Sequence, residues 1–224
     1  MSQQDRPEAA IKTLDGGTGE MFDAIAGRYD MLNRLMSLGQ DQYWRRRATR
    51  ALELQEDDQI LDVATGTGDL AIMIARRHPE VRVEGVDLSK NMIAVGRDKV
   101  ADKELSERVE LTLGDGLDMP YEDDSFDGAV VAFGIRNFPD RLQGLREMRR
   151  VTRPGRKVVI LELSEPRKGI MAVAARTYIH HVVPVMGSLL SGKKEYRYLQ
   201  ESIQAFPPAE DFVALMGEAG LTGA

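Results

Sequence analysis

Residues 59–75 contain the pattern that most restricts how this chain folds. The short apolar run 59–63 predicts a buried strand, and residues 70–75 predict the start of a helix. Between them, Gly66 and Gly68 indicate a backbone that bends sharply, or that approaches a group which a Cβ atom would block. The helix after such a turn directs free backbone N–H groups toward that group. The stretch therefore predicts a strand–turn–helix unit that binds a ligand.

The spacing of the glycines separates this turn from two phosphate-binding loops. A dinucleotide fingerprint needs G-x-G-x-x-G, and a P-loop needs G-x-x-x-x-G-K followed by Ser or Thr. Here Ala64, Gly66 and Gly68 occupy alternate positions and no lysine follows. The turn resembles motif I of the class I S-adenosylmethionine-dependent methyltransferases, acidic-x-G-x-G-x-G, with Asp62 as the acidic residue and Ala64 in place of the first glycine. The alternative is an ordinary turn of an α/β protein.

From Gln59 onward the pattern alternates strands and helices, which is typical of a parallel sheet covered by helices on both faces. Ser89 is a candidate N-cap, and Pro154-Gly155 predicts a turn before the last strand. The length of 224 residues fits a single domain, which we place at residues 19–224. The predicted strands are 59–63, 81–86, 109–113, 126–133 and 157–163, with helices over about 69–77, 89–100, 140–152 and 209–219.

The residues before the sheet predict a flexible tail (1–18) and a helical cap (19–54). Apolar residues at helical spacing predict one helix over 18–36, ending at Gly39, and a second over about 41–52. The second helix carries four arginines that form a solvated face or contact anionic lipid headgroups or a substrate. They are Arg45, Arg46, Arg47 and Arg50.

Residues 164–208 interrupt the alternation and predict a substrate-side insert, because so long an excursion inside a compact domain is usually functional. Its apolar part, 170–190, contains Arg176, His180, His181 and Pro184, so it does not predict a membrane span. It could lie on a membrane surface, form a buried helix or form a dimer face.

Composition removes several classes of function. The formal charge of −6 argues against a broad nucleic-acid surface, so we expect no nucleic-acid partner. The chain has no cysteine and only three histidines, so we expect no metal site. The N-terminus has no apolar signal-peptide core, which favours a cytoplasmic protein.

Three aspartates fall at the carboxyl ends of predicted strands, where ligands bind in open parallel sheets. Asp62 lies within the end of the first, Asp87 ends the second and Asp115 follows the third. A carboxylate accepts two hydrogen bonds at once, so Asp87 suits the adjacent hydroxyls of a ribose. Asp115 could accept from the exocyclic amine of adenine. Asp is also common in ordinary loops, so each of the three aspartates, taken alone, could be a loop residue without a ligand.

Further segments make the resemblance narrower. The segment Phe133-Gly134-Ile135-Arg136-Asn137 is more specific than the glycine turn. The other matching segments are Phe22-Asp23-x-Ile25-Ala26-x-x-Tyr29-Asp30-x-x-Asn33, Ser37-Leu38-Gly39, Trp44-Arg45 and Tyr198-Leu199-x-x-Ser202-Ile203-x-x-Phe206-Pro207. With these segments, the chain resembles the quinone-biosynthesis C-methyltransferase family over residues 21–220.

The resemblance implies a Rossmann-like class I methyltransferase fold that binds S-adenosylmethionine. It implies C-methylation of the ring of demethylmenaquinol to menaquinol, with a ubiquinol precursor as the alternative acceptor. Ala132 stands where the family often has a serine that touches the cofactor, so we expect one hydrogen bond fewer. The candidate cofactor-binding residues are Asp62, Gly66, Thr67, Gly68, Asp87, Asp115 and Gly116.

The resemblance also implies two further sheet strands after the last predicted helix, whereas this sequence stops at Ala224. Without them the fifth strand would be an exposed edge. We expect lower stability than in a longer version, and thermal melts of the two would test this.

We expect Arg136, Asn137 and Tyr29 to carry the chemistry. A ring carbon of a quinol becomes a good nucleophile when a hydroxyl is deprotonated, and phenols titrate near ~10. We place Arg136 and Asn137 beside the quinol oxygens, with Tyr29 closing the pocket. Arg136 is permanently charged and would stabilise a developing phenolate, directly or through water. The alternatives are a surface salt bridge for Arg136, a turn for Asn137 and core packing for Tyr29.

The expected partners are a lipid quinol, a membrane touched peripherally at its inner face, and a second copy in a homodimer. The competing interpretations are a methyltransferase of the same fold with another small acceptor, an S-adenosylmethionine-binding regulator without activity, an NAD-dependent oxidoreductase and an RNA methyltransferase. The glycine spacing weighs against the oxidoreductase and the acidic composition against the RNA enzyme.

Overall fold

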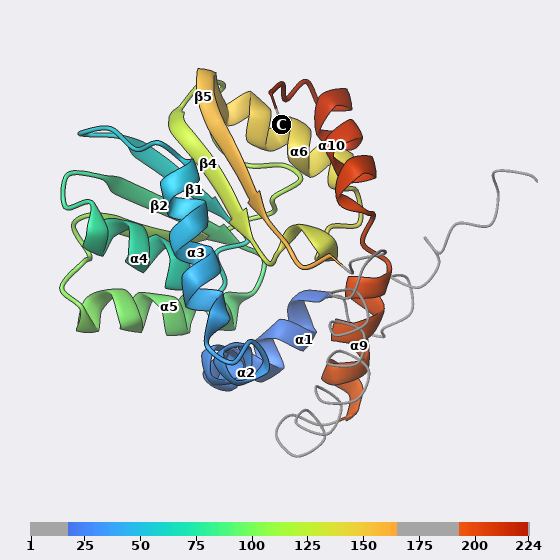
Figure 1. Ribbon diagram of the computed structural model, residues 1–224. Helices are drawn as coiled ribbons and strands as arrows, with labels where there is room; N and C mark the ends of the chain where they lie inside the picture. Colours follow the sequence, from blue (N-terminus) through green and yellow to red (C-terminus); the bar gives the residue numbers. More distant parts are fainter. Residues whose placement is uncertain (1–17, 165–192, 224) are drawn as a thin grey trace, which may run out of the picture.

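The computed structural model describes residues 18–164 and 193–223 (Figure 1). Residues 1–17 of the predicted tail and residues 165–192 of the predicted insert lie outside these ranges, together with His180, His181 and the apolar stretch 170–190. Within the described ranges, strands and helices follow one another from Gln59 to Leu161 in the predicted order, and residues 114–125 between the third and fourth strands contain no helix.

Five strands form one sheet in the order β3-β2-β1-β4-β5, and every neighbouring pair is parallel. The central strands β1 and β4 are nearly continuous apolar runs, as expected of strands buried on both faces. Strands β3 and β5 form the two edges, and no strand follows β5 in the described part of the chain. The strands are β1 (Gln59–Val63), β2 (Arg82–Asp87), β3 (Val109–Leu113), β4 (Phe126–Ala132) and β5 (Thr152–Leu161).

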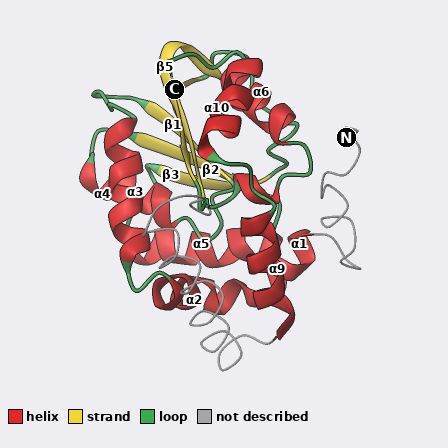
Figure 2. Cartoon of the chain, turned by 45° about the vertical axis from the view of Figure 1, so that its right-hand side comes forward, coloured by secondary structure: helices red, strands yellow, loops and turns green. Residues whose placement is uncertain are grey.

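Helices cover both faces of the sheet, which confirms the predicted fold class (Figures 1 and 2). One face packs against α3, α4 and α5, and the opposite face packs against α6 and α10. The helices are α3 (Gln40–Ala51), α4 (Asp69–Arg77), α5 (Lys90–Asp102), α6 (Arg141–Val151), α9 (Lys193–Gln204) and α10 (Ala209–Glu218). Ser89 caps α5 as predicted, because its side chain accepts a hydrogen bond from the Met92 N–H.

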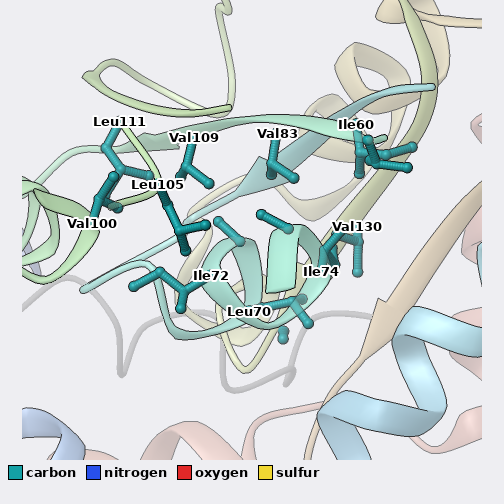
Figure 3. Close-up of a cluster of buried hydrophobic side chains, with 14 of the residues drawn as sticks. Ile60, Leu70, Ile72, Ile74, Val83, Val100, Leu105, Val109, Leu111 and Val130 are labelled. Carbon is teal, nitrogen blue, oxygen red and sulfur yellow. The ribbon is translucent and has the colours of Figure 1, made fainter. Parts of the chain in front are cut away.

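The two layers of core follow from the alternation of side chains along each strand. Ile60 of β1 belongs to the cluster under α4 and α5, whereas Leu61 and Val63 belong to the cluster under α6 and α10. Figure 3 shows the first cluster, to which α4 contributes Leu70 and Ile74. Each fully buried aliphatic side chain stabilises the fold by about 1.5–3 kcal/mol relative to leaving it exposed.

The prediction of one unbroken helix over residues 18–36 is wrong. The segment forms α1 (Thr18–Ile25), a 3-10 turn η2 (Ala26–Arg28) and α2 (Tyr29–Met36). Gly27 in the turn is a weak helix former, and Ala26 is buried beside Met92 of α5. The broken segment crosses the carboxyl end of the sheet and lies below it in Figure 1.

The predicted start of the fifth strand at Lys157 is also wrong, since β5 begins at Thr152. Phe126 pairs with Thr152 and Gly128 with Lys157, so the residues between form an irregularity in the ladder. Gly155, at φ +80°, supplies the backbone bend that the Pro154-Gly155 pattern predicts.

Candidate active site

A pocket of about 710 Å³, open to solvent, lies at the carboxyl end of the sheet. Its walls are the glycine turn after β1, the residues that follow β2, β3 and β4, and side chains of α1 and α2. Six predicted site residues line it, namely Tyr29, Gly66, Asp87, Asp115, Gly116 and Asn137. Asp62, Thr67, Gly68 and Arg136 lie outside the lining.

Asp87 ends β2 and holds the glycine turn against that strand. Its Oδ2 atom accepts a hydrogen bond from the Gly66 N–H at 2.8 Å, and its Oδ1 atom accepts one from the Ser89 N–H at 2.9 Å. Burial raises the pKa of Asp87 above its usual range, although these two hydrogen bonds oppose the rise. Each carboxylate oxygen has a second lone pair, so Asp87 can accept further hydrogen bonds from a ligand.

Asp115 and Gly116 form the wall after β3. The Oδ1 atom of Asp115 accepts a hydrogen bond from the Leu117 N–H at 2.9 Å, which fixes the side chain in a local turn. A Cβ atom on Gly116 would lie 2.7 Å from the Phe138 ring, so a larger residue would displace that ring from the pocket wall.

The turn after β1 uses the left-handed region at alternate positions. Ala64, Gly66 and Gly68 have φ values of +52°, +59° and +75°. Two of these positions carry glycine, which adopts the conformation at no steric cost, whereas Ala64 is strained. A Cβ atom on Gly68 would lie 3.0 Å from Leu111, so Gly68 is needed for close packing beneath the turn and not as a pocket wall.

Asp62 lies behind the turn and is buried. Its Oδ2 atom accepts a hydrogen bond from the Thr65 hydroxyl at 2.7 Å. Burial raises the pKa of Asp62 to about 6, while the Thr65 hydrogen bond and the Arg45 guanidinium oppose the rise. The geometry gives Asp62 the role of holding the turn.

Thr67 connects the turn to the N-terminal helices. Its hydroxyl donates to Oδ1 of Asp30 on α2 at 2.5 Å and accepts from Nζ of Lys99 on α5 at 3.1 Å. Lys99 also contacts Asp30 at 2.6 Å and Asp69 at 2.5 Å. This four-residue cluster, which we call the cap latch, joins α2, the glycine turn, α4 and α5.

Asn137 and Tyr29 both line the pocket. The Oδ1 atom of Asn137 accepts a hydrogen bond from the hydroxyl of Tyr198 on α9 at 3.0 Å. Burial raises the pKa of Tyr198, so its phenol stays a neutral donor. Tyr29 packs edge-on against Phe22 with 6.0 Å between the ring centroids, and both rings line the pocket.

Arg136 lies in the short turn η3 (Ile135–Asn137), between lining residues, and is itself buried. Its Nη1 atom donates to Oε1 of Glu162 at 2.8 Å and to the Phe133 carbonyl, and its backbone N–H donates to Oε2 of Glu162 at 3.1 Å. Burial alone would lower the pKa of the guanidinium, but Glu162 and then Tyr29 raise it, so the group stays charged. The surface salt bridge considered as an alternative is therefore wrong, because both side chains are at most 7% exposed.

The four arginines of α3 divide into two groups. Arg45 is buried, with its guanidinium carbon 5.2 Å from the centre of the Phe133 ring, so it packs behind the pocket. Arg46, Arg47 and Arg50 are exposed.

Sequence reasoning missed Glu162, Lys99 and Tyr198 as members of this region. Glu162 follows β5 in the same way that Asp87 ends β2, so the rule for carboxylates at strand ends could have identified it. Lys99 carries no comparable signal, because its partners lie 30 or more positions away in the sequence. Tyr198 begins one of the segments that carry the family resemblance, but that segment does not specify its partner Asn137.

The described residues contain no group of three or more His, Cys, Asp or Glu side chains that could hold a metal ion. None of the helices in these ranges is both long and apolar enough to cross a bilayer.

Comparison with known proteins identifies the relatives of this chain. The model of the ubiE/COQ5 methyltransferase family matches residues 11–224. The chain belongs to this family. The ubiquinone/menaquinone biosynthesis C-methyltransferase UbiE of Geobacter sulfurreducens is 47% identical over 90% of this chain and 79% of its own length. The demethylmenaquinone methyltransferase of Deinococcus radiodurans is 44% identical over 98% of this chain and 91% of its own. The predicted family and the prediction of a methyltransferase are confirmed.

Solved structures show the same fold at low sequence identity. A Methanococcus maripaludis protein, provisionally described as an S-adenosyl-L-methionine-dependent methyltransferase, superposes with a TM-score of 0.65 at 17% identity, covering 94% of this chain and 90% of its own. The [4+2]-cyclase SpnF superposes with a TM-score of 0.59 at 23% identity, covering 68% and 61%. Because a cyclase shares the fold of this chain, the fold alone does not determine the reaction.

Proposed function

We propose that this protein methylates a ring carbon of demethylmenaquinol, with S-adenosyl-L-methionine as the methyl donor, to give menaquinol. The observation that carries the proposal is the partly buried Asp87 carboxylate in the pocket wall, in a chain of the ubiE/COQ5 family. The Gly66 and Ser89 N–H groups donate to this carboxylate and fix its position. The names of relatives at 44% identity or more include demethylmenaquinone methyltransferase, which favours this acceptor. A ubiquinol precursor is the second candidate because other relatives are named for both quinones.

The residues around the pocket fit this cofactor. Asp87 offers lone pairs to a vicinal diol and Asp115 to an amine. A Cβ atom on Gly66 would lie 3.7 Å from Cε1 of Tyr29, so glycine keeps the space between the turn and α2 open. The Phe22 and Tyr29 rings offer aromatic surface to a cationic ligand. We therefore assign cofactor contacts to Gly66, Asp87, Asp115 and Gly116, and supporting roles to Asp62, Thr67 and Gly68.

When bound, S-adenosyl-L-methionine supplies an electrophilic methyl group. The task left to the protein is to orient the acceptor ring, exclude water and favour the ionised quinol. Arg136 supplies positive charge from behind the lining, and its guanidinium acts to lower the pKa of the Tyr198 phenol, against the larger rise that burial causes. We assign Asn137 and Tyr29 to direct contact with the quinol oxygens, because both line the pocket.

The substrate also determines where the protein works. A prenylated quinol resides in a bilayer, so we place the protein in the cytoplasm with peripheral contact to the inner face of the membrane. The homodimer stays a prediction.

The test is transfer of labelled methyl from S-adenosyl-L-methionine to reduced, short-tailed demethylmenaquinol, compared with a ubiquinol precursor that lacks its ring methyl. Turnover of the first is expected. Arg136→Ala should lower kcat at least about tenfold with cofactor affinity retained, while the exposed Arg146→Ala on α6 serves as the control. Turnover of the ubiquinol precursor alone would favour the second candidate, and turnover of neither, with intact cofactor binding, would overturn the proposal.

A further inference from the structure

Exposed apolar side chains gather at one end of the N-terminal helices. The described part of the chain exposes seven large apolar side chains, and four of them lie on α2, the turn after it and the first turn of α3. They are Met31, Leu35, Leu38 and Tyr43. In Figure 1, α2 lies at the lower edge of the molecule. Single exposed apolar residues are ordinary, but a cluster is typical of an interaction surface.

Leu38 is the most unusual member of this cluster. It is 67% exposed, more than any other large apolar side chain of the described residues, and its backbone adopts the left-handed region at φ 51°. That conformation is unfavourable for a leucine. The exposure and the backbone strain of Leu38 both oppose folding of the isolated chain. The next residue, Gly39, is also left-handed at φ 76°. Such a position suits a side chain that enters an apolar environment outside the protein.

The exposed charged side chains in residues 28–51 are all positive. Residues 28–51 contain six arginines and two aspartates, on a chain whose net charge is −6. Asp30 is bound to Lys99 in the cap latch, and Asp41 is buried and accepts hydrogen bonds from Ser37 and Gln42. Every exposed charged side chain of this segment is therefore an arginine. They are Arg28, Arg34, Arg46, Arg47 and Arg50.

We propose that this basic and apolar surface, the α2–α3 surface, binds the face of an anionic lipid bilayer. Apolar side chains enter the headgroup region and the arginines contact lipid phosphates, which is how interfacial helices bind membranes. A second copy of the chain is a poorer partner, because two surfaces of the same charge would face each other.

Helix α2 contributes both to the α2–α3 surface and to the pocket wall. Tyr29, the first residue of α2, lines the pocket, and Met31 lies two residues further on. A lipid quinol would pass from the bilayer to the pocket along α2, a route that rests on the proposed function. The binding itself can be measured without any quinol.

The test is flotation of the full-length chain with vesicles of phosphatidylcholine alone or with about one third phosphatidylglycerol. We expect binding only to the anionic vesicles, and loss of most of it in 0.5 M NaCl (about a 4–5 Å Debye length). Leu38→Asn keeps a residue that tolerates the left-handed region and should weaken binding about tenfold, and Arg34→Gln should weaken it about fivefold. The controls are Val213→Asn on α10 and Arg146→Gln on α6, both exposed, which should bind as wild type does.

Several outcomes would overturn the inference. If vesicle binding did not depend on lipid charge, or if the control variants lost as much binding as Leu38→Asn and Arg34→Gln, the α2–α3 surface would not be the membrane-binding surface. A dimer in light scattering that Leu38→Asn dissociates, without vesicle binding, would assign the surface to a second copy. Assays with a short-tailed quinol in solution keep this test separate from the proposed function. Leu38→Asn should leave that activity unchanged, and vesicle binding without turnover of any quinol would contradict the proposed function alone.

Discussion

The carboxylate of Glu162 holds Arg136 by its side chain and by its backbone at once. One oxygen accepts from the guanidinium and the other from the backbone N–H at the start of η3, while the Leu163 N–H also donates to the side chain of Glu162. Glu162 therefore fixes the position of Arg136 and the turn that carries Asn137 into the pocket.

Glu162→Gln should lower kcat about tenfold or more and leave cofactor affinity within about threefold, because it disturbs the quinol side of the pocket. Without the negative charge of Glu162, the positive charge of the Arg136 guanidinium is no longer balanced by a neighbouring carboxylate. The unbalanced positive charge favours the phenolate form of a bound quinol. The rising limb of kcat against pH should then move to lower pH. Steady-state kinetics across pH and titration of the cofactor product would measure both effects.

The matched control for this substitution is Glu147→Gln. Glu147 is buried to a similar degree and likewise binds a guanidinium, that of Arg150, and a backbone N–H, that of Met119. It lies on α6 and outside the pocket lining. Both variants should lose stability, but only Glu162→Gln should change kcat. Equal effects on kcat would mean that Glu162 acts through stability alone.

Ala64→Gly should raise the stability of the protein by roughly 0.5–1 kcal/mol. Ala64 adopts φ +52°, a region that glycine reaches without a steric clash. The relief of this strain outweighs the entropy that glycine adds to the unfolded chain. Urea unfolding would measure the change. The control is Ala94→Gly, at an exposed position inside α5, where the variant should lose about 1 kcal/mol of stability because glycine is a weak helix former.

Asp62→Asn should change how stability depends on pH. The pKa of Asp62 is about 6 in the folded protein, above its usual value of 3.8, so the folded state binds the proton more tightly than the unfolded chain. This group's contribution to stability therefore falls as the pH rises from about 4 to 6. Asn cannot ionise, so the variant should gain relative to wild type over this window, by on the order of 2–3 kcal/mol at pH 7.5. Denaturant unfolding at pH 4.5 and pH 7.5 would measure the stability of the variant relative to wild type. The same stability difference at both pH values would contradict the prediction.

Lys99→Met should loosen the N-terminal helices. It removes the cation from the cap latch and leaves the carboxylates of Asp30 and Asp69 close together. Breaking such a partly buried arrangement costs about 1–3 kcal/mol. Hydrogen exchange of residues 18–36 should accelerate at least about tenfold, and the KM for the quinol should rise. Lys103→Met, at the exposed end of α5, should change neither quantity.

The parts of the fold that local pattern determines could be predicted from the sequence. The bounds of β1, α4 and β3 agree with the prediction to the residue, because each is an apolar segment bounded by residues that terminate strands or helices. The start of β5 was not predictable, because it depends on pairing across an irregularity with Phe126. The break at Gly27 depends on where α1 meets α5, which is also a contact between distant segments.

The same distinction applies to the candidate site. Asp87 and Asp115 line the pocket because the position after a parallel strand is set by topology. Thr67 and Arg136 lie outside the lining because each is engaged by a distant partner, Asp30 in one case and Glu162 in the other. No spacing rule within the glycine turn or the F-G-I-R-N segment specifies those partners.

The hydrogen bond between Thr67 and Asp30 has a consequence for the order of events in turnover. The loop that would hold the methyl donor and the helix that would meet the quinol share one contact, so neither moves far without releasing the other. Exchange of spent donor and admission of a new acceptor would then belong to a single opening step.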